Sequence, residues 1–263
     1  MNLTAALPDI LERIVARKQA ELAEARVNED VLEKRARAVR RRDFTAALRA
    51  RRPAILAEIK KASPSKGVLS ANFDPALIAS QYRDGGAAAI SVLTDRDFFQ
   101  GSLADLETVR AAVDVPVLRK DFTIDEYQVL EAAAHGADAI LLIAAILNAR
   151  QMRDFREAAG RYGMAALVEV HDARELARAL ESGAEIIGVN NRDLRTFDVR
   201  LETSFDLVGT IPAQTLKISE SGIRNGEDVK RLSEAGFDAF LVGEHLMRSA
   251  NVEAAIRELV NVR

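Results

Sequence analysis

The sequence predicts an α/β protein, a (β/α)8 TIM barrel with an N-terminal helical extension. After residue 52, short apolar runs alternate with helical stretches, and they make eight strand-then-helix units in roughly 210 residues. Four times a glycine that suits the end of a helix stands before an apolar run, at Gly86, Gly136, Gly183 and Gly236. These four glycine-containing segments lie about fifty residues apart, which is twice the length of a compact strand–helix unit. The strict order of strand and helix favours a barrel over a doubly wound sheet.

Residues 1–51 are predicted to form the helical extension, which packs on the barrel. Residues 52–263 are predicted to form the barrel as a single catalytic domain. Leu7, Ile10, Leu11 and Ile14 repeat at spacings of three and four, as on one face of an amphipathic helix. We expect two or three helical pieces. Five arginines between residues 35 and 42 are interpreted as a solvated helix face, because acidic neighbours and a net charge of −3 argue against a nucleic-acid surface.

The eight strands of the barrel are predicted at two kinds of apolar run. One set follows the four glycines, and the other covers residues 54–60, 115–119, 165–170 and 215–219. Asp125 and Asp172 are expected to cap two of the helices. Helices are predicted over residues 75–84, 103–112, 125–135, 148–162, 172–182, 200–208, 225–235 and 251–261.

The first predicted strand carries two charges on one face. Because side chains alternate along a strand, Glu58 and Lys60 share a face, opposite Ile55, Ala57 and Ile59. Two charges in a covered sheet are costly unless they pair or face a wet cleft. Ser63 and the following Pro-Ser-Lys-Gly offer hydroxyls, an ammonium and free backbone, which suit a phosphate. The alternative is a simple ion pair followed by an ordinary turn.

Polar side chains collect at the carboxyl ends of six predicted strands, where the active site of such a barrel lies. Helix capping accounts for one or two such residues, and six strand ends exceed that need. Gly222 and Gly243, after the seventh and eighth strands, are expected to present backbone N–H groups to a phosphate, although each alone could be a tight turn. The polar residues at these six ends are Glu58, Lys60, Arg119, Lys120, Asp121, Glu169, His171, Asn190, Asn191, Arg192, Asp193, Ser219, Glu220, Ser221 and Glu244.

The composition excludes several classes of site. The chain has no cysteine, which removes disulfides, a thiolate nucleophile and a cysteine zinc cluster. His135, His171 and His245 are scattered, so we expect no metal and no cofactor. No apolar run reaches about 18 residues, and the net charge is negative, so we expect a cytoplasmic protein without a membrane or nucleic-acid partner.

The predicted site holds lysines beside carboxylates. This pairing suits acid–base chemistry on a sugar phosphate, because burial and neighbouring charges can bring either pKa toward neutrality. The same set of residues would also allow a lysine that forms a Schiff base with the substrate. One of Phe98 and Phe99 could stack on a planar ring, while the other could belong to the core. Spacing alone does not separate these chemistries.

Taken in order, the motifs resemble a known family. Lys60-Lys61-Ala62-Ser63-Pro64 lies in residues 58–67, and further motifs occupy residues 91–94, 98–102, 118–122, 167–171, 188–194, 219–223 and 241–244. This set resembles the indole-3-glycerol phosphate synthases of tryptophan biosynthesis and covers nearly the whole chain. The resemblance implies a carboxy-lyase that closes 1-(2-carboxyphenylamino)-1-deoxyribulose 5-phosphate to indole-3-glycerol phosphate, with loss of CO2 and water. It also implies a monofunctional enzyme, which we expect to be a monomer.

The resemblance implies roles for single residues. Lys120 matches the general acid that acts on the substrate carbonyl, and Glu169 matches the general base. Glu58 and Lys60 match a pair used in binding and proton transfer, and which lysine donates in the dehydration step stays open. The remaining matches are Asn190 and Ser221 as orienting groups, Arg192 as a substrate-binding residue, Lys60, Ser63, Gly222, Gly243 and Glu244 around the phosphate, and Phe99, Phe122 and Leu141 around the anthranilate ring. His245 departs from the family pattern.

Three other functions compete with this one. A phosphoribosyl isomerase-type barrel would share the phosphate site, but it would not explain Glu58 and Lys60 together with Lys120. A non-catalytic barrel that binds a phosphate metabolite or a partner protein would not need Lys120 or Glu169. Nucleic-acid binding through residues 35–42 is the weakest alternative. For the synthase we expect that removing residues 3–51 weakens substrate binding more than it unfolds the barrel.

Overall fold

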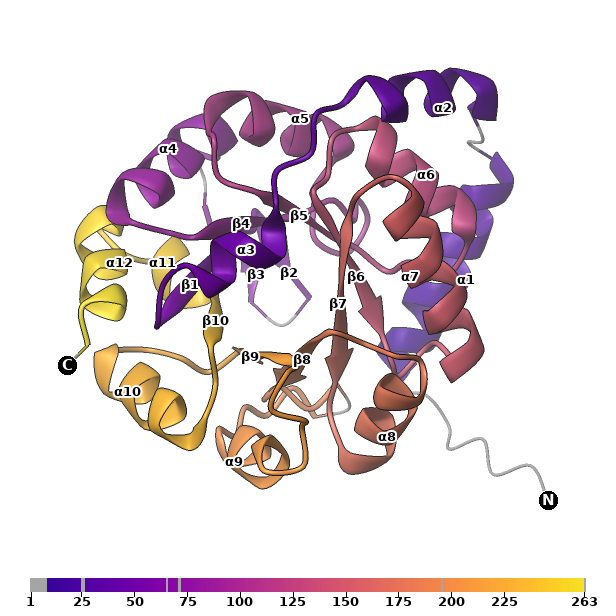
Figure 1. Cartoon of the computed structure of the whole chain (residues 1–263). Helices are drawn as coiled ribbons and strands as arrows, with labels where there is room; N and C mark the ends of the chain where they lie inside the picture. Colours follow the sequence, from indigo (N-terminus) through magenta and orange to yellow (C-terminus); the bar gives the residue numbers. More distant parts are fainter. Residues whose placement is uncertain (1–8, 25–26, 65, 71, 195, 263) are drawn as a thin grey trace.

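The computed structural model describes residues 9–24, 27–64, 66–70, 72–194 and 196–262. Eight parallel strands close into a barrel in the order β1-β10-β9-β8-β7-β6-β5-β4 (Figure 1), which confirms the predicted fold. A small antiparallel pair, β2 (Ala62–Ser63) and β3 (Gly67–Val68), follows the first strand. The barrel strands are β1 (Ala54–Ile59), β4 (Ala89–Leu93), β5 (Val117–Lys120), β6 (Ala139–Ile143), β7 (Ala165–Val170), β8 (Ile186–Asn190), β9 (Leu216–Glu220) and β10 (Ala239–Val242).

A helix follows each barrel strand and belongs to the outer ring. Asp125 and Asp172 accept backbone N–H groups at two helix starts, as predicted. The short α11 (Glu244–Met247) is an additional helix after β10. The ring consists of α4 (Pro75–Gly85), α5 (Leu103–Ala112), α6 (Glu126–Ala134), α7 (Ala149–Arg161), α8 (Ala173–Glu181), α9 (Glu202–Val208), α10 (Gly226–Ala235) and α12 (Val252–Val260). Among these described helices, none is long and apolar enough to cross a membrane.

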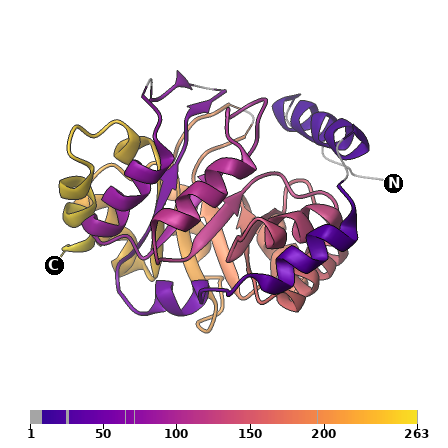
Figure 2. The ribbon, with the colours of Figure 1, turned by 90° about the horizontal axis from the view of Figure 1, so that it is seen from above.

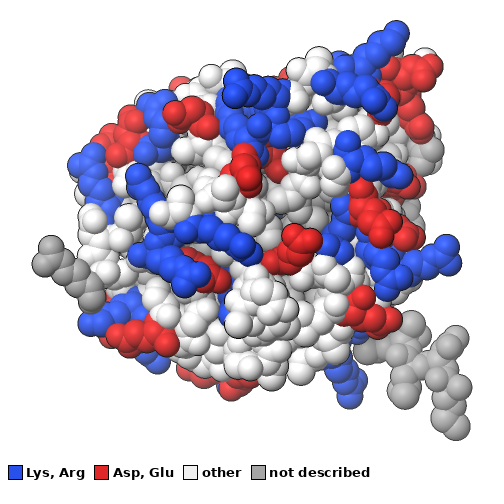
Figure 3. All heavy atoms as spheres, viewed as in Figure 1, with Lys and Arg blue, Asp and Glu red and all other residues white. Residues whose placement is uncertain are grey.

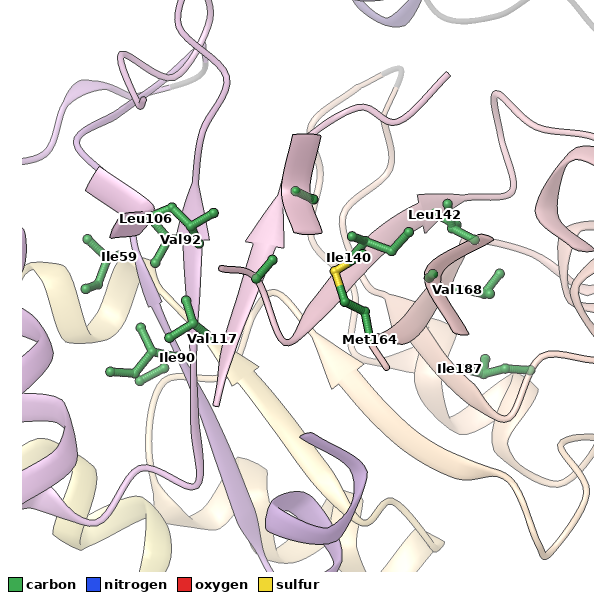
Figure 4. Close-up of a cluster of buried hydrophobic side chains, with 14 of the residues drawn as sticks. Ile59, Ile90, Val92, Leu106, Val117, Ile140, Leu142, Met164, Val168 and Ile187 are labelled. Carbon is green, nitrogen blue, oxygen red and sulfur yellow. The ribbon is translucent and has the colours of Figure 1, made fainter. Parts of the chain in front are cut away.

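The alternation of side chains along each strand produces two apolar layers. Ile55, Ala57 and Ile59 point into the layer between barrel and helices, as predicted from the first strand. Figure 4 shows Ile59 in this layer with residues of neighbouring strands. Leu56 instead belongs to the cluster inside the barrel. Glu58 lies on the same face as Leu56, so its carboxylate continues the interior column at the carboxyl end of β1.

The extension consists of α1 (Asp9–Glu24), α2 (Glu29–Ala38) and α3 (Phe44–Arg49), which lie at different places on the barrel. In Figure 2, α1 lies at the edge of the barrel that carries β2 and β3, and α3 lies at the opposite edge. Phe44 and Leu48 of α3 are fully buried and join the apolar cluster inside the barrel. The extension therefore closes the bottom of the barrel with α3 and reaches its top with α1.

Two arginines of the basic run are not on a solvated helix face. α2 ends at Ala38, and Arg41 donates to the carbonyl oxygens of Ala133 at 2.8 Å and Tyr162 at 3.0 Å. Arg42 donates to the carbonyl of Val115 at 2.9 Å. Burial lowers the pKa of Arg41 to about 10. The prediction of a solvated face is wrong for this pair, because these guanidinium groups satisfy backbone oxygens at the ends of other elements.

Candidate active site

All fourteen predicted site residues line one cavity of about 810 Å³. The cavity opens at the carboxyl ends of the barrel strands, where an enzyme of this fold places its chemistry. Residues from α1 and from the turns after β1, β8, β9 and β10 complete the wall. The fourteen are Glu58, Lys60, Ser63, Phe99, Lys120, Phe122, Leu141, Glu169, Asn190, Arg192, Ser221, Gly222, Gly243 and Glu244.

Glu58 and Lys60, the two charged residues predicted on one face of the first strand, form an ion pair. Lys60 Nζ lies 2.6 Å from Glu58 Oε1, and the side chain of Glu58 is buried. Gly243 borders this carboxylate so closely that a Cβ there would lie 2.5 Å from Glu58 Oε1. Since real Cβ atoms do not approach so near, a glycine at the end of β10 leaves the room that the Glu58 carboxylate needs.

Lys120 lies between two buried carboxyl groups. Its Nζ is 3.1 Å from Glu169 Oε2 and 3.8 Å from Glu220 Oε2. Burial alone would lower the pKa of Lys120, but the neighbouring carboxyl groups, Glu169 foremost, outweigh it and raise that pKa above its ordinary value. Lys120 is therefore a cation at neutral pH and can donate a proton or a strong hydrogen bond.

Glu169 and Glu220 have opposite titration behaviour. Burial favours the neutral form of Glu169, yet Lys120 and His171 outweigh it and hold the pKa of Glu169 well below its usual range. Burial and the neighbouring charge of Glu169 raise the pKa of Glu220 well above its usual range. Two carboxyl groups that share one cation thus divide into an ionised group and a protonated group.

Glu220 is a site residue that sequence reasoning placed at a strand end but gave no role. A signal was present, because alternation along β9 places Glu220 on the same face as Leu216 and Ile218 of the barrel interior. Gly188 on the neighbouring strand leaves space for it, since a Cβ there would collide with the Glu220 carboxyl group. Glu220 is 1% exposed, so its protonated form is the one that burial permits.

An apolar wall faces these charges. The rings of Phe99 and Phe122 lie 6.0 Å apart between centroids and are tilted by 36°, an arrangement usual for aromatic pairs. Of the two candidate ring-stacking residues, Phe99 lines the cavity. Leu141 of β6 and three side chains of α1, Ile10, Leu11 and Ile14, extend the wall. Their helical spacing was predicted, but their place above the barrel was not.

The rim opposite this wall is polar. Asn190 accepts the backbone N–H of Arg192 at 3.1 Å, and the guanidinium of Arg192 lies 3.6 Å from Glu244 Oε2. Ser221 and Gly222 both have positive φ, so the backbone reverses sharply after β9. A Cβ at Gly222 would lie 2.5 Å from Val199, which explains the glycine there.

The described part of the chain contains no group of three or more His, Asp or Glu side chains that could hold a metal ion. His135 pairs with Glu107, outside the cavity. His245 lines the cavity, and its Nε2 is buried without a hydrogen-bond partner among the described residues. The site thus presents a cationic lysine between an ionised and a protonated carboxyl group. This arrangement, at the carboxyl ends of barrel strands, is that of a TIM-barrel enzyme that uses acid–base catalysis.

Comparisons with known proteins agree with this class and narrow it. The family profile described as "Indole-3-glycerol phosphate synthase" matches residues 11–259. The chain is 51% identical over 260 residues to the indole-3-glycerol phosphate synthase of Albidiferax ferrireducens, covering 96% of this chain and 98% of that protein. It is 50% identical over 259 residues to the synthase of Desulfotalea psychrophila, covering 96% and 99%. The chain belongs to the indole-3-glycerol phosphate synthase family, as its motifs indicate, and is therefore a lyase of tryptophan biosynthesis.

A solved structure of a more distant protein shares the fold alone. The thiamine phosphate pyrophosphorylase of Pyrococcus furiosus superimposes with a TM-score of 0.61 at 18% identity, covering 82% of this chain and 96% of that one. The isomerase and binding-protein alternatives are not favoured, because the family profile and the relatives above carry the synthase description.

Proposed function

We propose that this cavity closes the ring of 1-(2-carboxyphenylamino)-1-deoxyribulose 5-phosphate, with Lys120 as the general acid and Glu169 as the general base. The observation that carries the proposal is the position of Lys120 Nζ, 3.1 Å from Glu169 Oε2 in a cavity lined by all fourteen residues that the family pattern selects. A cationic acid beside an ionised base is the pair that this reaction needs.

Lys120 would protonate the carbonyl oxygen at C2 of the sugar chain. The ring carbon that bears the carboxylate attacks C2 and forms the new carbon–carbon bond, while the C=O electron pair moves to oxygen. The carboxylate then leaves as CO2 and its bonding electrons restore the aromatic ring. Placed proton donors of this kind contribute about 10²- to 10⁴-fold to a rate.

Glu169 would accept the proton from C1 when the C2 hydroxyl, protonated by Lys120 or Lys60, departs as water and the C1–H bonding electrons form the double bond of the pyrrole ring. Its ionised state supports this role, because a base must be unprotonated before it acts. The protonated neighbour Glu220 supports the same division, since it offers a donor and leaves Glu169 as the acceptor. Asn190 and Ser221 would orient the hydroxyl groups of the substrate.

The two ends of the substrate match the two walls of the cavity. Phe99, Phe122 and Leu141 would enclose the anthranilate ring. The phosphate would lie at the polar rim, near the ammonium of Lys60 and the hydroxyl of Ser63, with backbone N–H groups of Gly222, Gly243 and Glu244. Arg192 would complete the charge balance of this end.

The remaining expectations are proposals as well. We propose a monofunctional, cytoplasmic monomer without cofactor, with residues 1–51 as an extension on a catalytic domain of residues 52–263. Figure 3 shows basic and acidic side chains interspersed on the face of the molecule viewed in Figure 1, which gives no support to a nucleic-acid surface there. A small phosphorylated substrate is the proposed partner.

Product formation tests the proposal directly. Purified protein mixed with the carboxyphenylamino-deoxyribulose phosphate, without added metal, should give rising indole fluorescence. Lys120→Ala should lose about 10²- to 10⁴-fold in rate. Lys61→Ala is the matched control, since this lysine is outside the cavity lining and should leave the rate unchanged. If the folded intact protein forms no product, the synthase function is refuted, and the isomerase and binding-protein functions must be tested instead.

A further inference from the structure

His171 stands between two carboxylates at the end of β7. Its Nε2 lies 3.3 Å from Glu169 Oε1, and its Nδ1 lies 2.9 Å from Glu175 Oε2 on α8. The same oxygen of Glu175 also accepts the backbone N–H of His171 at 2.8 Å. The imidazole side chain is 13% exposed and does not line the cavity. It can therefore act on the reaction only through Glu169.

The charges around this imidazole come from four elements. Glu169 of β7 and Glu175 of α8 contact it, Lys120 of β5 contacts the other oxygen of Glu169, and Glu220 of β9 interacts with Glu169. Burial would lower the pKa of His171, but the two contacting carboxylates raise it to about 10. His171 is thus an imidazolium at neutral pH, hydrogen-bonded through Nδ1 to Glu175 and paired with Glu169 by charge at 3.3 Å, without a hydrogen bond at Nε2 to any described residue.

We propose that His171 is a positioning residue that holds Oε1 of Glu169 and thereby leaves Oε2 for Lys120 and the reacting proton. The terminal torsion of a glutamate is broad, so one partner, Lys120, leaves the plane of the Glu169 carboxylate free to turn, and a second partner restricts it. Here the hydrogen bond to Glu175 fixes the ring of His171, and the charge of the imidazolium attracts the nearer oxygen of Glu169. The inference rests on the proposed role of Glu169 as the base.

The same contact keeps Glu169 ionised. A cation beside a carboxylate lowers the pKa of that carboxylate, so removal of the imidazolium raises the pKa of Glu169. A base acts only above its own pKa, and the acid limb of kcat against pH must then move to higher pH. His171→Asn should show this movement together with a kcat lower by about 10- to 100-fold, the usual loss for a group that orients a functional side chain. KM should change little, because His171 does not touch the cavity.

A second variant changes the charge of His171 without removing its ring. Glu175→Gln keeps an oxygen that can accept the backbone N–H of His171 but removes one of the two carboxylates that raise its pKa. The pKa of His171 should fall toward its ordinary value of about 6.5. A new basic limb in kcat should then appear near neutral pH, and the His171 Cε1–H signal in NMR should titrate over the same range.

The matched control is Glu107→Gln beside His135. The His135 Nδ1 to Glu107 carboxylate distance is 2.9 Å, as between His171 and Glu175, but the His135 pair lies outside the cavity. The dependence of kcat on pH in the Glu107→Gln variant should therefore stay unchanged. An intact protein that makes product, together with His171→Asn and Glu175→Gln variants that keep its kcat profile, would overturn the positioning role alone. An intact protein that makes no product would refute the proposed function itself.

Discussion

The ammonium of Lys18 lies 3.0 Å from the carboxylate of Asp121, the residue that follows Lys120 in the chain. It also lies 2.9 Å from Asp95, and the three side chains are almost completely buried. Lys18 belongs to α1, the helix that covers the cavity with Ile10, Leu11 and Ile14. A buried ionic contact thus fixes the cavity cover to the segment that carries the proposed general acid.

Lys18→Met should destabilise the protein and raise KM. The variant leaves Asp95 and Asp121 buried with one cation fewer, and breaking a buried pair in this way costs about 3–5 kcal/mol. Because α1 then loses its fixed position, substrate binding should weaken more than kcat falls. Denaturant unfolding and steady-state kinetics measure the two effects.

Arg17→Met is the matched control for Lys18. Arg17 is the next residue of α1, and its pair with Asp97 is partly exposed, so the loss should be at most about 1 kcal/mol. Equal losses in the two variants would contradict the distinction between buried and exposed pairs on α1.

Asp121 should make the stability depend on acid pH. Burial would raise its pKa, but Arg119 and Lys18 outweigh burial and lower it to about 2, below the ordinary value of 3.8. A lowered pKa contributes stability that is present above pH 3.8 and is lost as the pH falls toward 2. The contribution is about 2 kcal/mol. Unfolding free energies at pH 4.5 and 2.5 should therefore differ less in Asp121→Asn than in the intact protein, and an equal difference would refute this.

Glu169 and Glu220 should respond differently to the same substitution. Glu169→Gln removes the ionised base, and kcat should fall by about 10²- to 10⁴-fold. Glu220→Gln replaces a protonated carboxyl with a neutral amide of similar shape, so stability and kcat should change much less. Stopped-flow product formation compares the two variants. A Glu220→Gln protein as inactive as Glu169→Gln would show that Glu220 also acts as an ionised group.

Removal of the extension should have two separate consequences. Deletion of residues 1–27 removes α1 and should raise KM while the barrel stays folded, because its main contacts are with the cavity and the loops above it. Deletion of residues 1–51 also removes Phe44 and Leu48, whose burial stabilises the fold by about 1.5–3 kcal/mol each. We therefore restrict the expected loss of binding without unfolding to α1. Thermal unfolding of both deletions checks this.

Local rules were enough to predict the fold and to place most polar residues of the proposed site at one end of the barrel. Alternation along β1 placed Glu58 inside, and strand ends located Lys120 and Glu169. All four glycines predicted to end helices, Gly86, Gly136, Gly183 and Gly236, have positive φ, as predicted. Each of these features depends on a few neighbouring residues, and a short stretch of sequence therefore contains the information.

The missed features depend on distant partners. Lys18 was not singled out from the sequence, because Asp95 and Asp121 lie far from it in the chain and approach it only in the folded barrel. Arg41 and Arg42 looked like a solvated face for the same reason. Residue type and spacing give the period of a helix but not the element that covers it.

The guanidinium of Arg41 has a consequence for the order of events during synthesis. Its acceptor on Tyr162 comes 121 residues later in the chain. A ribosome adds about 5–20 residues per second, so Tyr162 is synthesised roughly 6–24 s after Arg41. Phe44 and Leu48 leave the ribosome in the same interval without a barrel to enter. The nascent extension therefore presents an apolar segment to chaperones for seconds before its own fold can cover it.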